Sequence, residues 1–146
     1  MTYTNTTPYA ALILRLALGT MFIAHALLKI LVFTPAGTVG FFASLGVPGW
    51  LAYPVMGLEL FGGLMLLTGI QVRAVSVALI PVLIGSIVLV HAGNGWLFSN
   101  EHGGWEYPLF LTVATMVQAL LGDGAYSIGE LVNRSKSANT ARVATA

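Results

Sequence analysis

The sequence predicts an all-α integral membrane protein, a bundle of four transmembrane helices. Two observations lead to this fold class. Of the 146 residues, 57% are apolar and only 8% are charged, whereas a soluble domain carries about 25% charged residues. The apolar residues also gather in four long runs, and about 20 residues of helix are needed to cross a bilayer. A water-soluble surface cannot be built from this sequence.

The four apolar runs fix the order and limits of the predicted helices. Their approximate ranges are 9–33, 51–69, 72–91 and 105–121. The second and third runs are separated only by a tight turn at Ile70 and Gln71. Glycine and proline inside the runs are compatible with helices, because neighbouring helices in a membrane satisfy the backbone groups that these residues disturb.

Two connections on one side of the predicted bundle are long. In the first, residues 34–50, Val39, Phe42 and Leu45 repeat at helical spacing. This spacing predicts a short helix lying in the membrane interface between the first two transmembrane helices. The second connection, residues 92–104, mixes glycines with aromatic and charged residues.

The distribution of Lys and Arg predicts the orientation of the bundle. With the N-terminus inside, five basic residues lie on or toward the cytoplasmic side, and only Lys29 lies toward the other. The five are Arg15, Arg73, Arg134, Lys136 and Arg142. Both termini are therefore predicted to be cytoplasmic. We expect the polar tail, residues 122–146, to be largely disordered.

Three ionisable residues, Arg15, His25 and Glu59, lie deep within the predicted helices. Each costs about 2.5–3.5 kcal/mol on insertion scales, so each needs a partner. At about 1.5 Å of rise per residue, His25 and Glu59 both lie roughly 10 Å below the outer surface. Two partners for Glu59 stay open: His25, which is nearer in depth, and Arg15, which lies roughly 15 Å closer to the cytoplasm.

Further polar residues come from the outer ends of the predicted helices. These are Lys29, His91, Asn94, Glu106 and Tyr107. Together with His25 and Glu59 they predict a polar pocket that opens to the outer side. A buried Glu beside a His is suited to proton transfer. We therefore take Glu59 and His25 as candidate catalytic residues, and Arg15 with the five outer residues as candidate ligand-binding residues.

A purely structural interpretation of the same residues stays open. Glu59 and its partner would then form an ion pair that fixes the register of two helices. Lys29 and Glu106 would extend to the solvated rim of the membrane.

Composition excludes several kinds of site and partner. The chain contains no cysteine, which excludes disulfides, thiolate metal sites and cysteine-ligated iron–sulfur clusters. A redox role would need a borrowed cofactor or a quinone. His25 and His91 are not at a spacing diagnostic of haem or metal binding, so neither haem nor a bound metal is predicted. The net charge is +1 without a basic stripe, which argues against a nucleic-acid partner.

Taken in order, these segments resemble the DoxX family of bacterial membrane proteins over about residues 10–128. The segments are "LILRLALGTMFIAHALLKI", "FFASLGVPGWLAY", "GLELFGGLMLLTGIQVRA", "VLVHAGNGWLF" and "GGWEYPLFLTVATMVQALLGDGAYSI". One departure is Ala26 in "AHALLK", where family members more commonly have glycine. The resemblance implies a multi-pass protein of the bacterial inner membrane, with residues 1–121 as its four-helix DoxX-like domain.

The DoxX family is named for a link to quinone-coupled sulfur oxidation, which leads to a functional hypothesis. The chain would be a membrane subunit of a quinone-linked oxidoreductase system, embedded in the lipid bilayer and served by a redox partner protein. A non-catalytic membrane scaffold or assembly factor is the alternative. A small transporter is a third reading, and the lack of repeated halves argues against it. Homo-oligomer formation and any catalysis by the chain itself are left open.

Overall fold

The computed structural model describes residues 5–129, and the regular elements within them are all helical. The predicted all-α class is confirmed. The α-helices are α1 (Thr7–Leu27), α2 (Pro35–Ser44), α3 (Ala52–Thr68), α4 (Val72–Ser86) and α5 (Glu106–Leu121). Short π-helical or 3-10 segments adjoin them: η1 (Leu28–Val32), η2 (Gly49–Leu51), η3 (Ile87–His91) and η4 (Ala92–Asn94). Residues 130–146 of the predicted tail lie outside the described residues.

Three helices are long and apolar enough to cross a membrane. They are Thr7–Val32, Gly49–Thr68 and Val72–Asn94, of 26, 20 and 23 residues. The fourth predicted crossing corresponds to α5, which is apolar but has 16 residues. At about 1.5 Å per residue α5 is roughly 24 Å long, shorter than a hydrocarbon core of about 30 Å.

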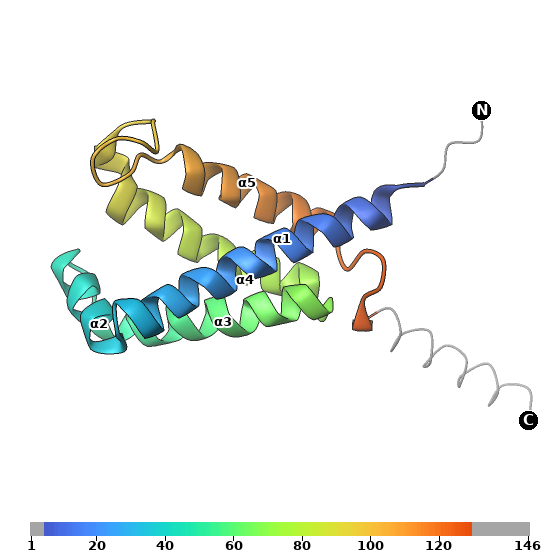
Figure 1. Ribbon diagram of the computed structural model, residues 1–146, viewed down its shortest axis with the longest axis horizontal. Helices are drawn as coiled ribbons and strands as arrows, with labels where there is room; N and C mark the ends of the chain where they lie inside the picture. Colours follow the sequence, from blue (N-terminus) through green and yellow to red (C-terminus); the bar gives the residue numbers. More distant parts are fainter. Residues whose placement is uncertain (1–4, 130–146) are drawn as a thin grey trace, which may run out of the picture.

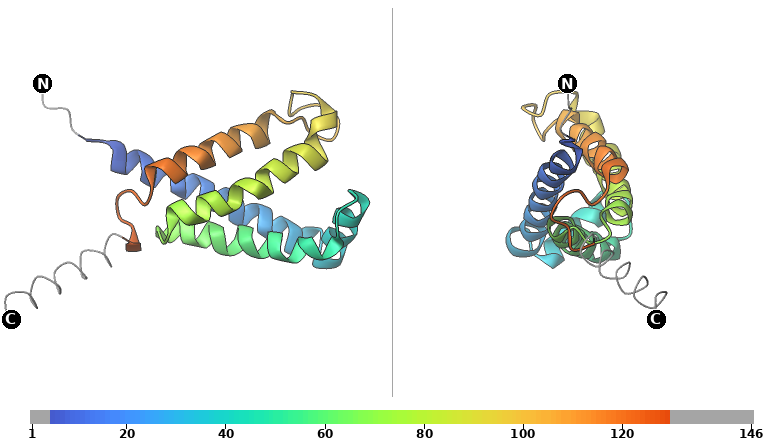
Figure 2. Two further views of the ribbon diagram at one scale, coloured as in Figure 1. Left: turned by 180° about the vertical axis from the view of Figure 1, so that it is seen from behind. Right: turned by 90° about the vertical axis from the view of Figure 1, so that its right-hand side faces the viewer.

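The helices are arranged as two antiparallel pairs that form a V. One pair is α1 with α3, and the other is α4 with α5 (Figure 1). The pairs meet at the α3–α4 turn and diverge toward α2 and the loop of residues 92–104, as the views from behind and from the side also show (Figure 2). We call the meeting point, with residues 122–129, the closed end. The end that carries α2 and the loop is the open end.

Local backbone chemistry sets where the helices stop. Helix α3 ends at Gly69, whose φ of 72° is accessible to glycine without the strain that a Cβ atom would add. The hydroxyl oxygen of Thr34 accepts a hydrogen bond from the backbone N–H of Gly37 and so caps α2, which begins at Pro35. The hydroxyl of Thr38 donates to the backbone oxygen of Lys29 at 3.1 Å, which ties α2 to η1.

Close contact between two glycines joins α1 to α3. A Cβ atom added at Gly19 would lie 2.8 Å from the backbone oxygen of Gly63, and one added at Gly63 would lie 2.9 Å from the backbone oxygen of Gly19. The two backbones therefore touch without an intervening side chain. This is the small-residue packing that membrane helices use to approach closely.

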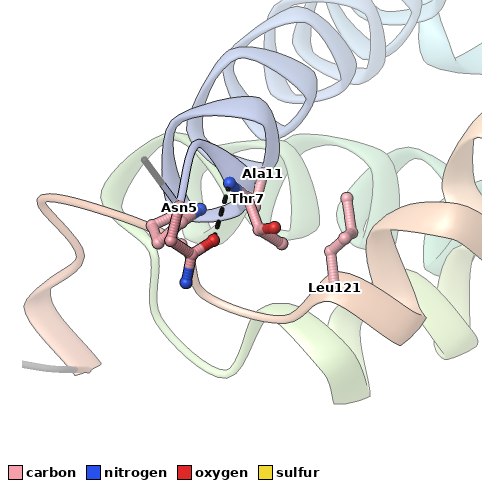
Figure 3. Close-up of a pocket in the computed structure, with 6 residues that line it drawn as sticks. Asn5, Thr7, Ala11 and Leu121 are labelled. Atoms are coloured by element: carbon pink, nitrogen blue, oxygen red, sulfur yellow. Dashed lines mark hydrogen bonds between the residues drawn. The ribbon is translucent and has the colours of Figure 1, made fainter. Parts of the chain in front are cut away.

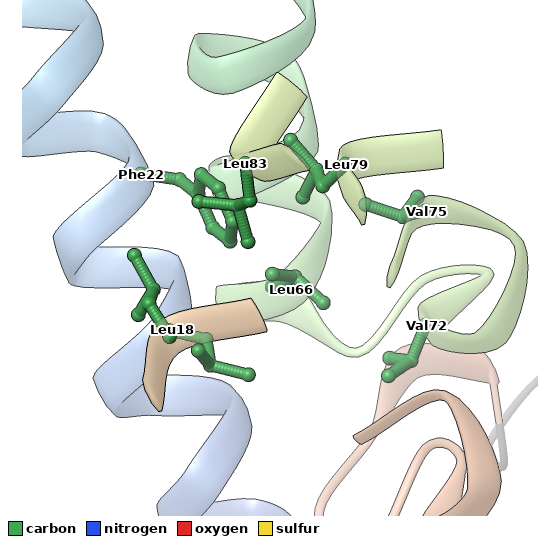
Figure 4. Packing of buried hydrophobic residues seen from close by; sticks show 8 residues of the cluster. Leu18, Phe22, Leu66, Val72, Val75, Leu79 and Leu83 are labelled. Atoms are coloured by element: carbon green, nitrogen blue, oxygen red, sulfur yellow. The ribbon is translucent and has the colours of Figure 1, made fainter. Parts of the chain in front are cut away.

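Apolar side chains from both pairs fill the V near the closed end (Figure 4). We call these eight buried residues the core cluster. They are Leu18, Phe22, Leu66, Val72, Val75, Leu79, Leu83 and Leu111. Along α1, Leu18 and Phe22 lie between the deep residues Arg15 and His25. The core cluster thus separates two groups of polar side chains, one at each end of the bundle.

Candidate functional site

The central feature of the candidate site is an ion pair between Lys29 and Glu59. The Lys29 Nζ atom lies 2.8 Å from both Oε1 and Oε2 of Glu59. The Glu59 side chain is 6% exposed and the Lys29 side chain 20% exposed. The pair joins η1 to α3, on the open-end side of the core cluster.

This pairing corrects two sequence-based expectations. Glu59 was expected to pair with His25 or Arg15, and Lys29 was expected at the solvated rim. The reason is that side chains on a helix tilt toward its N-terminus. On the antiparallel α1 and α3, Lys29 therefore leans inward while Glu59 leans outward, and their side chains converge. Arg15 also leans toward the closed end, and so away from Glu59. A depth estimate from Cα positions alone misses this convergence.

His25 lies near this ion pair, and Tyr107 stacks on the His25 ring. The His25 Nδ1 atom is 2.8 Å from the backbone oxygen of Met21. Because a carbonyl oxygen only accepts, Nδ1 carries a proton, and Nε2 is the ring nitrogen that gains or loses one. The rings of His25 and Tyr107 stack at 6.3 Å between centroids, which links α1 to α5. His25 is also close enough to Glu59 to interact with it electrostatically.

We call His25, Lys29, Glu59 and Tyr107 the polar cluster. The Tyr107 hydroxyl contacts the Sδ atom of Met21 at 3.9 Å, and a thioether is a weak acceptor. The cluster thus combines an ammonium group, a carboxylate, an imidazole and a phenol. These groups can donate hydrogen bonds and exchange protons.

Arg15 belongs to the closed end. Its Nη1 donates to the backbone oxygens of Leu66 at 3.0 Å and Leu67 at 2.7 Å, at the C-terminus of α3. Its Nη2 donates to the backbone oxygens of Ala125 and Tyr126, both at 3.0 Å. Arg15 therefore satisfies carbonyls that the end of a helix leaves unpaired, and it anchors the segment after α5.

Asp123 is a functional neighbour of Arg15 that the sequence reasoning missed. Its Oδ1 accepts a hydrogen bond from the backbone N–H of Val72 at 3.3 Å, at the N-terminus of α4. It also interacts electrostatically with Arg15. A signal was present, because Asp123 comes two residues after the last apolar run and a carboxylate is favoured at a helix N-terminus.

Three of the predicted ligand-binding residues organise the loop of residues 92–104. The His91 Nδ1 atom lies 2.9 Å from the backbone oxygen of Gly103. The Nδ2 of Asn94 donates to the backbone oxygens of Val90, His102 and Gly103. Oε1 of Glu106 accepts from the backbone N–H of Phe98 at 2.8 Å. These contacts shape the loop, and a ligand-binding role for the three residues stays a prediction.

A pocket of about 270 Å³ lies at the closed end, between the start of α1 and the end of α5 (Figure 3). It is lined by Asn5, Thr7, Pro8, Ala11, Leu121 and Gly124. None of these six side chains is ionisable, so the pocket supplies no group for proton exchange. Within residues 5–129, moreover, no three His, Cys, Asp or Glu side chains gather where they could hold a metal ion.

Comparison with known proteins gives two matches. The DoxX family model matches residues 10–92. A protein of Bacillus subtilis (strain 168) named "Putative oxidoreductase CatD" is 32% identical over 125 residues, which cover 86% of this chain and 88% of that protein. No solved structure matches the chain. The region matched by the family model contains Arg15, His25, Lys29 and Glu59.

Proposed function

Because this chain is a membrane protein that belongs to the DoxX family, we propose that it is a membrane subunit of a quinone-linked redox system. The polar cluster would be its quinone site. The name of the Bacillus subtilis relative, which describes that protein as an oxidoreductase, supports a redox role. The observation that carries the proposal is the buried Lys29–Glu59 ion pair near His25, whose ring stacks on that of Tyr107.

The polar cluster offers the groups that a quinone needs. A quinone site combines an apolar slot with hydrogen-bond donors for the carbonyl oxygens. Lys29 has three N–H donors, two of which bind Glu59, so one remains for a ligand. The Tyr107 hydroxyl, held only by a weak contact with sulfur, is a second donor. Phe22 of the core cluster, 1% exposed and one turn below His25, would form an apolar floor beneath this site.

In this proposal, Glu59 and His25 exchange protons with the quinone. Reduction of a quinone to a quinol consumes two electrons and two protons, and oxidation of a quinol releases them. His25 exchanges one proton through Nε2, and Glu59 exchanges the other through its carboxyl group. The electrons pass between the quinone and a redox partner protein.

The proposal places the chain in the bacterial inner membrane with four crossings and both termini in the cytoplasm. Arg15 and Arg73 lie at the closed end and Lys29 toward the open end, which supports this orientation. Helix α5 would be the fourth crossing despite its length, because it lies against α4 and its C-terminal end is level with the start of α4. Helix α2 would lie in the outer interface.

The second candidate function is a non-catalytic scaffold. One observation favours it: the deep charged groups Arg15, Lys29 and Glu59 all make contacts that join separate helices or segments. In that case the polar cluster holds the bundle together and binds no redox ligand.

Glu59→Gln separates the two functions. A neutral isostere keeps the packing and can still accept a hydrogen bond from Lys29, so the fold should persist. The amide has one oxygen in place of the two that position the Lys29 ammonium group, so this donor to the quinone is misplaced and we expect copurified quinone to disappear. Glu101→Gln is the matched control, because Glu101 is 90% exposed in the loop of residues 92–104 and has no proposed part in ligand binding. The measurement is lipid extraction and quinone quantification from wild type and both variants in one detergent. Equal quinone in Glu59→Gln and wild type, or none in wild type, would favour the scaffold.

A further inference from the structure

We infer that the polar cluster is accessible only through the open end of the bundle. Ligand and protons would thus enter and leave on the side that carries α2 and the loop of residues 92–104. The use of this route for quinone and protons rests on the proposed function. The route itself rests on the burial and packing of side chains along the bundle. It can be tested without a quinone.

Exposure increases from the closed end to the open end on the inward face of α4, whereas Ala26 of α1 and Ala52 of α3 stay fully buried. On α4, Leu79 is fully buried, Leu83 is 7% exposed, and Ser86, three residues further on the same face, is partly exposed. On α1, Phe22 is buried whereas His25 is partly exposed, and Lys29 retains 20% exposure. Because the two helix pairs diverge in this direction (Figures 1 and 2), the polar cluster lies where the bundle widens.

The segment of residues 122–129 covers the closed end, beside the pocket of uncharged residues between α1 and α5. The backbone N–H of Ala125 donates to the oxygen of Pro8 at 2.9 Å, and that of Gly129 donates to the oxygen of Gly69 at 3.2 Å. This segment therefore crosses from the start of α1 to the end of α3. Arg15, 1% exposed, lies above it with four carbonyl partners.

The core cluster separates the closed end from the polar cluster. Leu18, Phe22 and Leu66 are buried between Arg15 and His25, and they offer no group that carries a proton. On α5, the hydroxyls of Thr112 and Thr115 donate to carbonyls of their own helix. A fixed guanidinium charge at the inner edge adds an electrostatic barrier to protons. The polar cluster is thus left with the open end as its route.

Sidedness follows from this arrangement. In the proposed orientation the open end faces the outer compartment. Protons released at the polar cluster when a quinol is oxidised would leave to that compartment, and protons needed to reduce a quinone would come from it.

Substituted cysteines test the route, and the absence of native cysteine makes each single variant unambiguous. Ser86→Cys reports on the widening region, and Ser76→Cys, on the same helix, is the matched buried control. Ser99→Cys marks the open end and Tyr126→Cys the closed end. Spheroplasts and inverted vesicles are prepared from cells that express the full chain, so that opposite faces of the membrane are exposed. A membrane-impermeant cationic methanethiosulfonate is added to each preparation. Modification is measured by mass.

We expect Ser86→Cys to react from the same side as Ser99→Cys, about tenfold faster than Ser76→Cys, because modification requires an accessible thiolate. Reaction of Ser86→Cys from the side that labels Tyr126→Cys, or from neither side, would overturn the inference. A short-chain quinone should slow labelling of Ser86→Cys. Labelling from the open end that quinone does not slow would preserve the route and contradict the quinone site.

Discussion

Two basic residues, Arg15 of α1 and Lys29 of η1, are accommodated in the apolar bundle by different chemistry. Arg15 presents a planar fork with several donors, and it uses them on carbonyls of two separate segments. Lys29 has a compact ammonium group on a flexible chain, and it binds one carboxylate. The guanidinium thus acts on the backbone, whereas the ammonium group neutralises a buried charge.

Replacement of Lys29 should destabilise the protein more than replacement of Glu59. Lys29→Met leaves a buried carboxylate without a partner, which costs about 3–5 kcal/mol. Glu59→Gln costs less, because Lys29 is partly exposed and its long chain can extend to the interface. The double variant should recover most of the loss of Lys29→Met. Thermal unfolding in one detergent measures all three, and a double variant as unstable as Lys29→Met would contradict the buried pair.

Arg15→Lys removes the planar, forked guanidinium group but keeps the positive charge. The ammonium group cannot reach four carbonyls on two segments, so we expect a loss of about 1.5–3 kcal/mol, the size of a hydrogen bond to a charged group. Arg73→Lys is the control, since Arg73 is exposed and should tolerate the change. Chemical unfolding of both variants in detergent provides the comparison. Equal stability of the two would show that Arg15 acts through its charge alone.

At the residue level, the sequence identified the deep ionisable groups but assigned their partners incorrectly. An ionisable group in an apolar medium costs free energy, so Arg15, His25 and Glu59 stand out in the apolar runs. Their depths could then be estimated from the rise of an ideal helix. The pairing of Glu59 with Lys29 depends on side-chain tilt in two antiparallel helices, which a depth estimate ignores. The carbonyl partners of Arg15 leave no trace in sequence, since every residue has a carbonyl group.

At the element level, the bilayer makes helices easier to predict than the segments that join them. Backbone hydrogen-bonding groups in lipid must be satisfied within each helix, so a long apolar run is predicted to form a helix. The π-helical segments η1 and η3 were not anticipated. Both lie at open-end helix termini, where such segments often accompany functional sites. Their formation depends on contacts with α2 and the 92–104 loop, which the apolar pattern does not encode.

The glycine contact between α1 and α3 predicts a contrast within one helix. In Gly63→Ala the new Cβ atom would lie 2.7 Å from Cγ1 of Ile23 and 2.9 Å from the backbone oxygen of Gly19. Such overpacking costs about 1–3 kcal/mol. In Gly57→Ala the new atom meets nothing within 4 Å, so stability should stay the same or rise slightly. The measurement is the melting temperature of both variants. A Gly63→Ala variant as stable as wild type would rule out direct backbone contact.

At the scale of the whole molecule, two helix pairs share one closed end and diverge at the other. The Lys29–Glu59 pair and the glycine contact strengthen α1 with α3, whereas loop contacts of His91 and Asn94 strengthen the connection between α4 and α5. The pairs are joined to each other by the core cluster, by residues 122–129 and, nearer the open end, by the stacked rings of His25 and Tyr107.

The proposed topology predicts opposite locations for two parts of the chain. Alkaline phosphatase, which is active only in the periplasm, should be inactive when fused after Ala146. The same enzyme inserted at Ser99 should be active, because the loop would face outward. Enzyme activity normalised to the amount of fusion protein is the measurement. Activity of the fusion after Ala146 would mean that the chain crosses the membrane an odd number of times or in the reverse orientation.

The hydrogen bonds of Arg15 also set an order of events during synthesis. The carbonyl oxygens of Leu66 and Leu67 come 51 and 52 residues after Arg15, and that of Ala125 comes 110 residues after it. At about 5–20 residues per second, the guanidinium waits roughly 5–20 s for its last partners. In the proposed orientation Arg15 lies toward the cytoplasmic end, so it would extend to the interface in the meantime. The first helix thus enters the bilayer with a charge whose final site exists only after the last helix has been made.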